Sequence, residues 1–130
     1  MDNDKFSSSL ITPSVQDNIK IISFAAEPYP DGRRVLVRLL LSSFLKGPNA
    51  TINLSNEENQ ELAAVNIVSI FSPETEITLH IPGNKKLPGN YSVDVEVFYT
   101  EEEEIEQEGE KRLSFKQSLV DSASTSFSIQ

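Results

Sequence analysis

Apolar and polar residues alternate in short segments along most of the chain. The clearest segment places Ile77, Leu79 and Ile81 between polar residues. A second segment has apolar residues at every odd position from Tyr91 to Val97. Because successive side chains of a β-strand point to opposite faces, this period of two predicts two strands that are each buried on one face.

A less regular form of the same pattern predicts further strands. They are expected at residues 19–28, 33–44, 51–54 and 62–71, and from residue 113 onwards. The alternation in 62–71 is imperfect, which predicts a β-bulge there or, as the alternative, a helix over 57–65. The serine-rich end, 119–130, does not discriminate between a paired strand and an unpaired tail.

The number and spacing of these segments indicate the fold class. About seven short strands, separated by Gly, Pro and Asn residues, are typical of two packed antiparallel sheets. A parallel sheet needs crossover connections of about a dozen residues or more, usually helical, and the pattern indicates no such helix. We therefore predict an all-β fold, an antiparallel two-sheet β-sandwich.

Length and composition define the expected domain. A chain of 130 residues with 38% hydrophobic residues is expected to form one hydrophobic core. We predict a single sandwich domain over 18–130. Residues 1–17 are polar, rich in serine and interrupted by Pro13, which predicts a partly ordered N-terminal arm.

A short motif precedes the predicted strand at 91–97. Leu87 is followed by Gly89 and then by Tyr91. This spacing resembles the corner before the penultimate strand of immunoglobulin-like and fibronectin type III domains. The resemblance implies an immunoglobulin-like sandwich in which Tyr91 is the structural tyrosine corner and its hydroxyl bonds to upstream backbone. Val93 stands where antibody domains have a cysteine, and the chain has no tryptophan, so the resemblance extends to the architecture only.

The net charge of −9 is concentrated in one segment. Seven glutamates lie between Glu101 and Glu110, and removing their seven charges from −9 leaves −2 for the rest of the chain. The sequence also contains no cluster of Lys and Arg of the kind that binds phosphates. We expect neither a nucleic-acid partner nor an anionic membrane.

Several catalytic and metal-binding classes lack their residues. There is no cysteine, and His80 is the only histidine, so disulfides, thiolate sites and multi-histidine metal centres are excluded. Alternation predicts that His80 faces solvent from a strand. We expect no cofactor, no metal and no enzymatic activity. A small hydrolase remains the less favoured alternative, because composition alone does not exclude a serine, histidine and aspartate arrangement.

Two groups of residues are candidates for binding. The first is the predicted turn with Tyr29, Arg33 and Arg34, because aromatic and arginine side chains are common binding anchors. A plain turn is the alternative. The second is Phe98, which lies on the polar side of its strand and offers an aromatic face to a protein or a sugar. A carbohydrate-binding module is therefore another alternative, although the chain is poor in aromatic residues.

The glutamate run contains four further candidates, namely Glu101, Glu102, Glu103 and Glu104. We expect it to form an acidic turn through Gly109. It could attract a cation or a basic partner, but the chain has no loop with the ligand spacing of a calcium site. The simpler interpretation is a solvated hairpin tip whose charges discourage pairing between molecules.

These observations favour a non-catalytic protein-interaction or structural module. A protein partner is expected, and a homodimer through apolar outer positions such as Leu36 and Leu40 is an alternative. The segment from Met1 to Ser9 lacks the features of a secretory signal, which predicts a cytoplasmic protein unless an export signal has been removed. No stretch of about 20 apolar residues is present.

Overall fold

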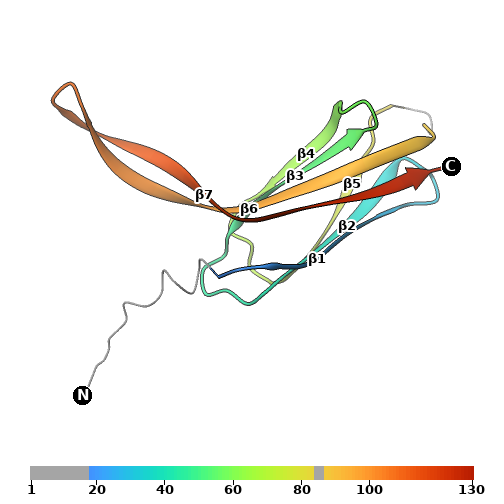
Figure 1. Ribbon diagram of the computed structural model, residues 1–130, viewed down its shortest axis with the longest axis horizontal. Coiled ribbons are helices and arrows are strands. Elements are labelled where there is room, and N and C mark those ends of the chain that lie inside the picture. Colours follow the sequence, from blue (N-terminus) through green and yellow to red (C-terminus); the bar gives the residue numbers. More distant parts are fainter. Residues whose placement is uncertain (1–17, 84–86) are drawn as a thin grey trace, which may run out of the picture.

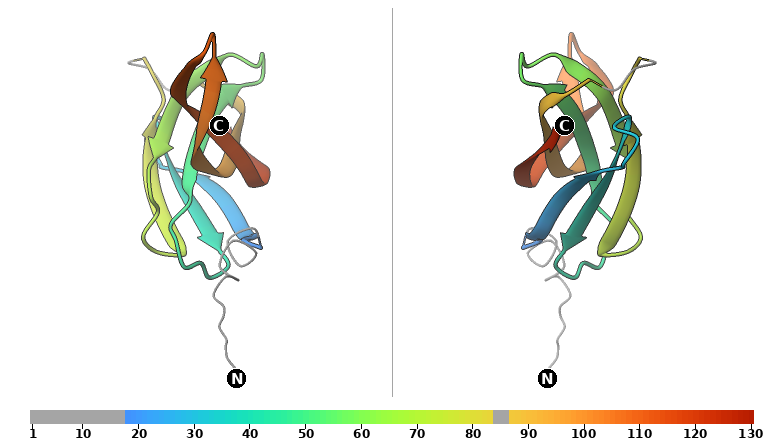
Figure 2. Two further views of the ribbon diagram at one scale, coloured as in Figure 1. Left: turned by 90° about the vertical axis from the view of Figure 1, so that its left-hand side faces the viewer. Right: turned by 90° about the vertical axis from the view of Figure 1, so that its right-hand side faces the viewer.

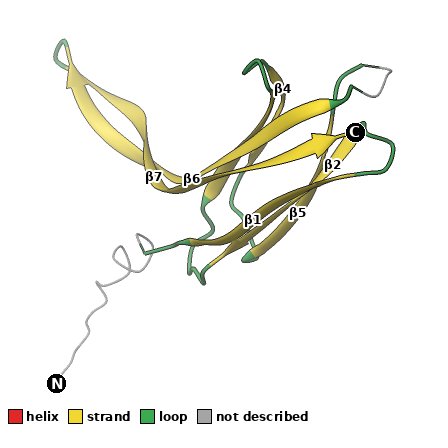
Figure 3. Ribbon diagram, turned by 45° about the vertical axis from the view of Figure 1, so that its right-hand side comes forward, coloured by secondary structure: helices red, strands yellow, loops and turns green. Residues whose placement is uncertain are grey.

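The computed structural model describes residues 18–83 and 87–130. In these ranges the chain forms seven antiparallel strands (Figure 1). The strands are β1 (Ile21–Pro28), β2 (Arg34–Leu41), β3 (Asn49–Asn56), β4 (Glu61–Ile67), β5 (Glu74–His80), β6 (Gly89–Gln107) and β7 (Glu110–Ile129). Figure 3 shows strands and loops, without a helix, in these ranges. The prediction of an all-β sandwich of two antiparallel sheets is confirmed. The predicted arm, residues 1–17, lies outside the described residues.

The first sheet has three strands in the order β1-β2-β5. Val37 at its centre pairs with Ala26 of β1 and Ile77 of β5. The odd-numbered residues of β2 from Val35 to Leu41 are buried, as their alternation predicts. This face is one wall of the core.

The second sheet has four strands in the order β4-β3-β6-β7. Val95 of β6 pairs with Ile52 of β3 and Ala123 of β7. The odd-numbered residues of β6 from Tyr91 to Tyr99 are buried against the first sheet. The core therefore forms where the two inward faces meet, and its stability derives from apolar burial.

The alternative prediction of a helix over 57–65 is wrong. β3 ends at Asn56 and β4 follows after a short turn. The side-chain oxygen of Asn56 accepts hydrogen bonds of 3.0 Å from the backbone amides of Glu58 and Gln60. Asparagine in this role stabilises a turn in place of a first helical turn.

The predicted bulge at the start of β4 is confirmed. Leu54 pairs with Ala63, but the next residue, Ser55, pairs with Glu61. Leu62 is therefore the extra residue. Such an insertion changes which residues of a strand face the core, and Leu62 and Ala63 are accordingly both half-buried. The strand predicted to continue to residue 71 ends at Ile67.

The interpretation of the acidic run as a turn is also wrong. Glu101 to Glu104 lie within β6, and the turn consists of Glu108 and Gly109 alone. Both residues have positive φ, 55° and 80°, as a two-residue type I′ hairpin requires. The serine-rich end, 119–130, which the pattern left open, pairs with β6 as part of β7 through Ile129.

Candidate functional site

β6 and β7 continue beyond the sandwich as a two-stranded extension, here called the ribbon and defined as residues 98–119 (Figure 1). The last pair between β3 and β6 is Asn49 with Phe98. From there to the tip at Glu108 and Gly109, β6 pairs with β7 only. Figure 2, left, looks onto the end of the molecule from which the ribbon projects.

A bulge marks the base of the ribbon. Val97 pairs with Asp121 and Phe98 with Leu119, so Val120 is an extra residue in β7. A bulge of this kind bends its strand and increases the local twist. It lies where the ribbon departs from the sandwich.

Specific hydrogen bonds hold this base to the sandwich. The hydroxyl of Tyr99 donates to the carbonyl of Lys46 at 2.6 Å, and Asn49 Nδ2 donates to Thr100 Oγ1 at 3.3 Å. On β7, Asp121 Oδ2 accepts from the backbone amide of Ile21 at 2.8 Å. Both strands are thus fixed to neighbouring elements where the ribbon begins.

The pairing register assigns the ribbon side chains to two faces. In the sandwich the odd residues of β6 point into the core, so the even residues from Phe98 onwards lie on the outer face. Glu102 pairs with Phe115 and Glu104 with Leu113, which puts these four side chains on that same face.

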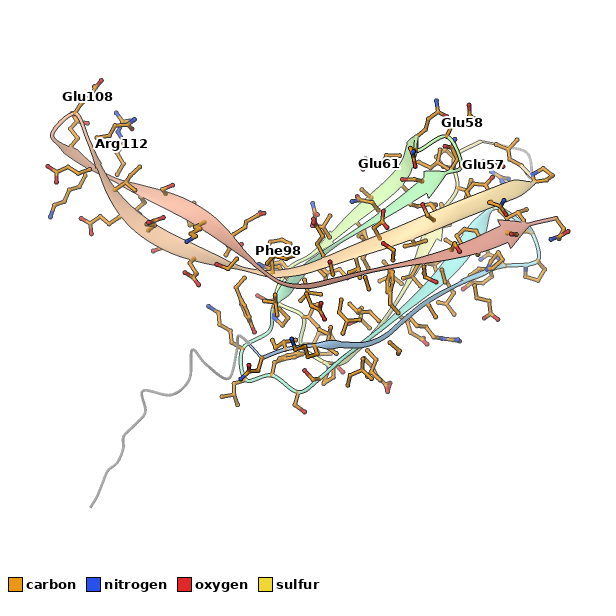
Figure 4. All side chains as sticks on the ribbon, viewed as in Figure 1. Glu57, Glu58, Glu61, Phe98, Glu108 and Arg112 are labelled. Carbon is orange, nitrogen blue, oxygen red and sulfur yellow. The ribbon has the colours of Figure 1, made fainter. Side chains whose placement is uncertain are left out.

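Three large apolar side chains are exposed on the outer face. Leu113, Phe115 and Leu119, here called the apolar row, are 67%, 65% and 61% exposed, and the exposed Gln117 lies between Phe115 and Leu119 on the same face. Phe98, half-buried, lies beside Leu119 at the base (Figure 4). Single exposed apolar residues are common, whereas several along one strand form a larger exposed apolar surface.

A row of glutamates runs beside the apolar row. Glu102, Glu104 and Glu106, here called the acidic row, share the outer face, while Glu101 and Glu103 point to the other face. Lys111 Nζ lies 3.6 Å from Glu104 Oε1. The remaining members of the acidic row form no ion pair within the described part of the chain.

The ribbon as a whole is negatively charged. Arg112 lies near the tip (Figure 4). Its Nη2 is 3.8 Å from Glu110 Oε2. Seven glutamates oppose Lys111, Arg112 and Lys116, and seven negative against three positive charges leave a net charge of −4. All the charged side chains are exposed, so these ion pairs contribute little to stability.

The turn with Tyr29, Arg33 and Arg34 lies at the opposite end of the sandwich from the ribbon (Figure 1). The Arg34 guanidinium lies 4.3 Å from the centre of the Tyr29 ring, and its Nε lies 2.9 Å from Asp31 Oδ2. The Arg33 side chain donates to the carbonyl of Gly83. These side chains contact one another, their own turn and the neighbouring residues Gly83 and Thr78, and they are not brought together with Phe98 or the glutamates.

Hydrogen bonds also perturb the carboxyl group of this turn. The backbone amide of Arg33 donates to Asp31 Oδ1 at 2.9 Å and is the main cause that lowers the pKa of Asp31. Desolvation is the second-largest effect and raises the pKa of Asp31, whereas the hydrogen bond and positive charge of Arg34 lower it further. The turn is accordingly stabilised from within.

Tyr91 occupies the corner before β6. Its hydroxyl donates to the carbonyl of Leu87 at 2.6 Å, and its ring stacks on Phe127 with 5.3 Å between ring centres. Burial raises the pKa of Tyr91, and the nearby Glu57 carboxylate adds to this effect. The bond to Leu87 is of the kind that the sequence resemblance implies for Tyr91.

Residues that could perform chemistry are dispersed. His80 is exposed on β5, where it pairs in register with Arg34. In the ranges 18–83 and 87–130, no three His, Asp or Glu side chains are grouped closely enough to hold a metal ion. Over the same ranges, no helix is long and apolar enough to cross a membrane.

Sequence patterns indicate the glutamates and Phe98 as binding candidates but do not reveal the apolar row. Leu113 and Phe115 were expected only to begin a strand, without a partner or a face. A signal was present in β6. Its odd, inward positions continue from Tyr99 to Glu101 and Glu103, and charged residues at successive inward positions indicate that a strand has left the core.

Comparisons with known proteins give no assignment. No protein-family model matches the chain, and no curated protein matches it in sequence. A family 76 glycoside hydrolase of a bovine Bacteroides thetaiotaomicron strain has a TM-score of 0.46 at 11% identity, over 78% of this chain and 20% of the other. The β-glucuronidase of Parabacteroides merdae gives 0.43 at 6% identity, over 77% and 13%.

A third solved structure covers more of the chain. The multi-modular chitinase of Paenibacillus sp. str. FPU-7 gives a TM-score of 0.40 at 16% identity, over 91% of this chain and 9% of the other. The chain thus spans a fifth or less of each of these enzymes. Similarity at this level carries no conclusion about function.

Proposed function

We propose that this protein is a non-catalytic interaction module that binds a protein partner through the ribbon. The observation that carries the proposal is the apolar row, three large side chains exposed on a two-stranded extension. A hairpin of two strands is marginally stable in water unless a third strand, a helix or another surface covers it. A binding partner would supply that cover.

The proposed superfamily agrees with this role. We propose that the sandwich belongs to the immunoglobulin-like and fibronectin type III group. Supporting features are the division into three and four strands, with Tyr91 and its bond to Leu87 at the start of the penultimate strand. Domains of this architecture commonly bind other proteins, which is an argument from analogy only.

The carbohydrate-binding alternative has less support. Sugars stack on exposed aromatic rings, and the outer face of the four-stranded sheet within the sandwich has serine, threonine, asparagine and acidic side chains. Phe98 at one end of this face is half-buried. The small-hydrolase alternative would need a nucleophile and an acid placed around His80, and no observation favours it.

Site-specific crosslinking tests the proposal. Phe115 is replaced by a photoreactive benzoylphenylalanine, and the control carries the same group in place of Phe71, which is 96% exposed in the β4–β5 loop. In extract of cells that make the protein, we expect a discrete protein adduct from position 115, removed by excess unmodified protein. The same excess of a competitor with Leu113→Ser, Phe115→Ser and Leu119→Ser, which also lacks the photoreactive group, should leave the adduct in place. Equal adducts from both positions would contradict the proposal.

A further inference from the structure

We infer that the partner presents a cationic amphipathic helix that lies along the outer face of the ribbon. The inference rests on the proposed function and specifies the chemistry of the partner. It follows from the two parallel rows on that face, one apolar and one acidic.

The dimensions of the rows limit what fits. Leu113 and Leu119 are six positions apart, which corresponds to about 20 Å at about 3.4 Å per residue. The acidic row lies on the neighbouring strand, roughly 5 Å away. A partner must therefore bring an apolar stripe about 20 Å long, with positive charge along one side of it.

A helix meets both requirements at once. About 13 residues of α-helix span 20 Å, and apolar residues at positions i, i+3, i+4 and i+7 form one continuous stripe. Lys or Arg residues on one flank of that stripe would face Glu102, Glu104 and Glu106. The long stems of these basic residues would add apolar contact to Phe115 and Leu113.

Addition of a strand to either edge of the ribbon fits less well. A strand beside β7 would place its side chains next to Lys111, Arg112 and Lys116, which repel a basic segment. A strand beside β6 would meet the glutamates, but β6 and β7 themselves would separate it from the apolar row. Neither edge offers the apolar and the acidic row together.

A second copy of this chain is also a poorer occupant. It has no helix in its described residues, and its own ribbon would bring a further −4 to the contact. Like charges brought together without compensation oppose association. Self-association through the ribbon would accordingly overturn the inference.

Peptide binding to the 130-residue chain tests the inference. The probe is a synthetic 14-residue helical peptide with leucines at positions i, i+3, i+4 and i+7 of successive turns and arginines on one flank. The controls are a peptide with glutamate in place of arginine and a scrambled peptide of the same composition. We expect the basic amphipathic peptide to bind at least about tenfold more tightly than either control, and more weakly at higher salt.

Paired charge variants assign the binding face. Glu102→Gln with Glu104→Gln removes two charges from the outer face, and Glu101→Gln with Glu103→Gln removes two from the opposite face. We expect about a fivefold loss of affinity for the first pair and less than about twofold for the second. Glu58→Gln with Glu61→Gln, in the distant β3–β4 hairpin, is the remote control (Figure 4). Equal losses for all three pairs would overturn the inference.

The outcomes separate this inference from the proposed function. If the position-115 crosslink forms but the basic helical peptide binds no better than its controls, the helix inference fails and the interaction module stands. If neither the crosslink nor the peptide shows specific binding, both fail. A dimer in sedimentation equilibrium that Leu113→Ser, Phe115→Ser and Leu119→Ser dissociates would identify a second copy as the occupant and overturn the helix.

Discussion

The two halves of the β6–β7 hairpin have the same antiparallel pairing but different surroundings. In the sandwich, β6 pairs with β3 and packs over the first sheet, so Val93, Val95 and Val97 are buried. In the ribbon, β6 continues without β3 and without an opposing sheet, and its side chains from residue 101 to the tip are exposed. Backbone pairing alone therefore does not bury a side chain.

The outer faces of these halves differ as well. In the sandwich, polar pairs satisfy each other, as in the hydrogen bonds from Ser124 Oγ to Asp94 Oδ1 at 2.5 Å and from Ser128 Oγ to Asn90 Oδ1 at 2.6 Å. In the ribbon, the apolar row occupies the corresponding face of β7. Exposure of the polar face to water carries no free-energy penalty. Covering the apolar row, in contrast, lowers the free energy, because apolar surface is removed from water.

Truncation of one leucine in the sandwich and of one in the ribbon should give the largest contrast. Leu54 of β3 is fully buried, and Leu54→Ala is expected to lower the free energy of unfolding by about 2–5 kcal/mol. Leu113→Ala in the ribbon should change it by less than about 0.5 kcal/mol. Urea unfolding measures both. Similar losses would mean that the ribbon is packed within the free protein, which would remove the distinction.

Removal of the Tyr91 hydroxyl should have the next largest effect. Tyr91→Phe deletes the hydrogen bond to Leu87 and is expected to cost about 1 kcal/mol in urea unfolding. Tyr29→Phe is the control, because the Tyr29 hydroxyl is exposed and lies 3.3 Å from Thr78 Oγ1. Equal losses in the free energy of unfolding would show that the bond from Tyr91 to Leu87 contributes no more than the exposed contact of the Tyr29 hydroxyl.

The same variant gives a pH prediction. The pKa of Tyr91 is raised in the folded protein, so folding favours the protonated phenol. Its contribution is complete below the ordinary tyrosine pKa near 10 and is lost as pH rises from there through the raised pKa. Tyr91→Phe should therefore lose less stability than the parent protein above about pH 10. Parallel pH profiles of the two proteins would contradict this.

A change at the ribbon tip should separate local from global stability. Gly109 has φ of 80°, a conformation that costs a residue with a Cβ about 1 kcal/mol. Gly109→Ala is expected to speed amide exchange in the ribbon and to leave exchange in β3 and global unfolding unchanged. Hydrogen exchange followed by mass spectrometry measures both regions. Faster exchange in β3 would indicate that ribbon and sandwich unfold as one unit.

The smallest expected effect is at the opposite end of the molecule. The lowered pKa of Asp31 means that its ionised form stabilises the β1–β2 turn at pH values above the ordinary 3.8. This contribution is lost as pH falls through the lowered pKa, and Asp31→Asn should remove that dependence. An NMR titration of the carboxyl group, with a midpoint below 3.8, is the direct measurement. A midpoint at or above 3.8 would contradict the hydrogen bonding described for this turn.

The sequence was informative where one face of a strand is buried. Alternation predicted the strand at 91–97, and the spacing of Leu87 and Tyr91 pointed to a corner whose bond spans only four residues. The run of Glu101 to Glu104 has no alternation because neither face of the ribbon is buried. A strand without a buried face leaves no period-two signal, and the ribbon was therefore mistaken for a turn.

Local sequence patterns do not reveal contacts between residues that are far apart in the chain. The hydrogen bond from Tyr99 to Lys46 joins residues 53 positions apart, and the extra residue Val120 is visible only once β7 is aligned with β6. The glutamates were recognised by composition. Their separation into two faces, and the apolar row beside one of them, depended on knowing the register.

The continuity of β6 and β7 through the sandwich and the ribbon has a mechanical consequence. A force that pulls the ribbon tip along its own axis acts on two strands that extend through the whole sheet. Because β6 is paired with β3 inside the sandwich, this force loads the pairs from Asn49 with Phe98 to Asn56 with Tyr91 in shear. Tension applied at the ribbon would thus be borne by the pairing of β6 with β3 inside the sandwich.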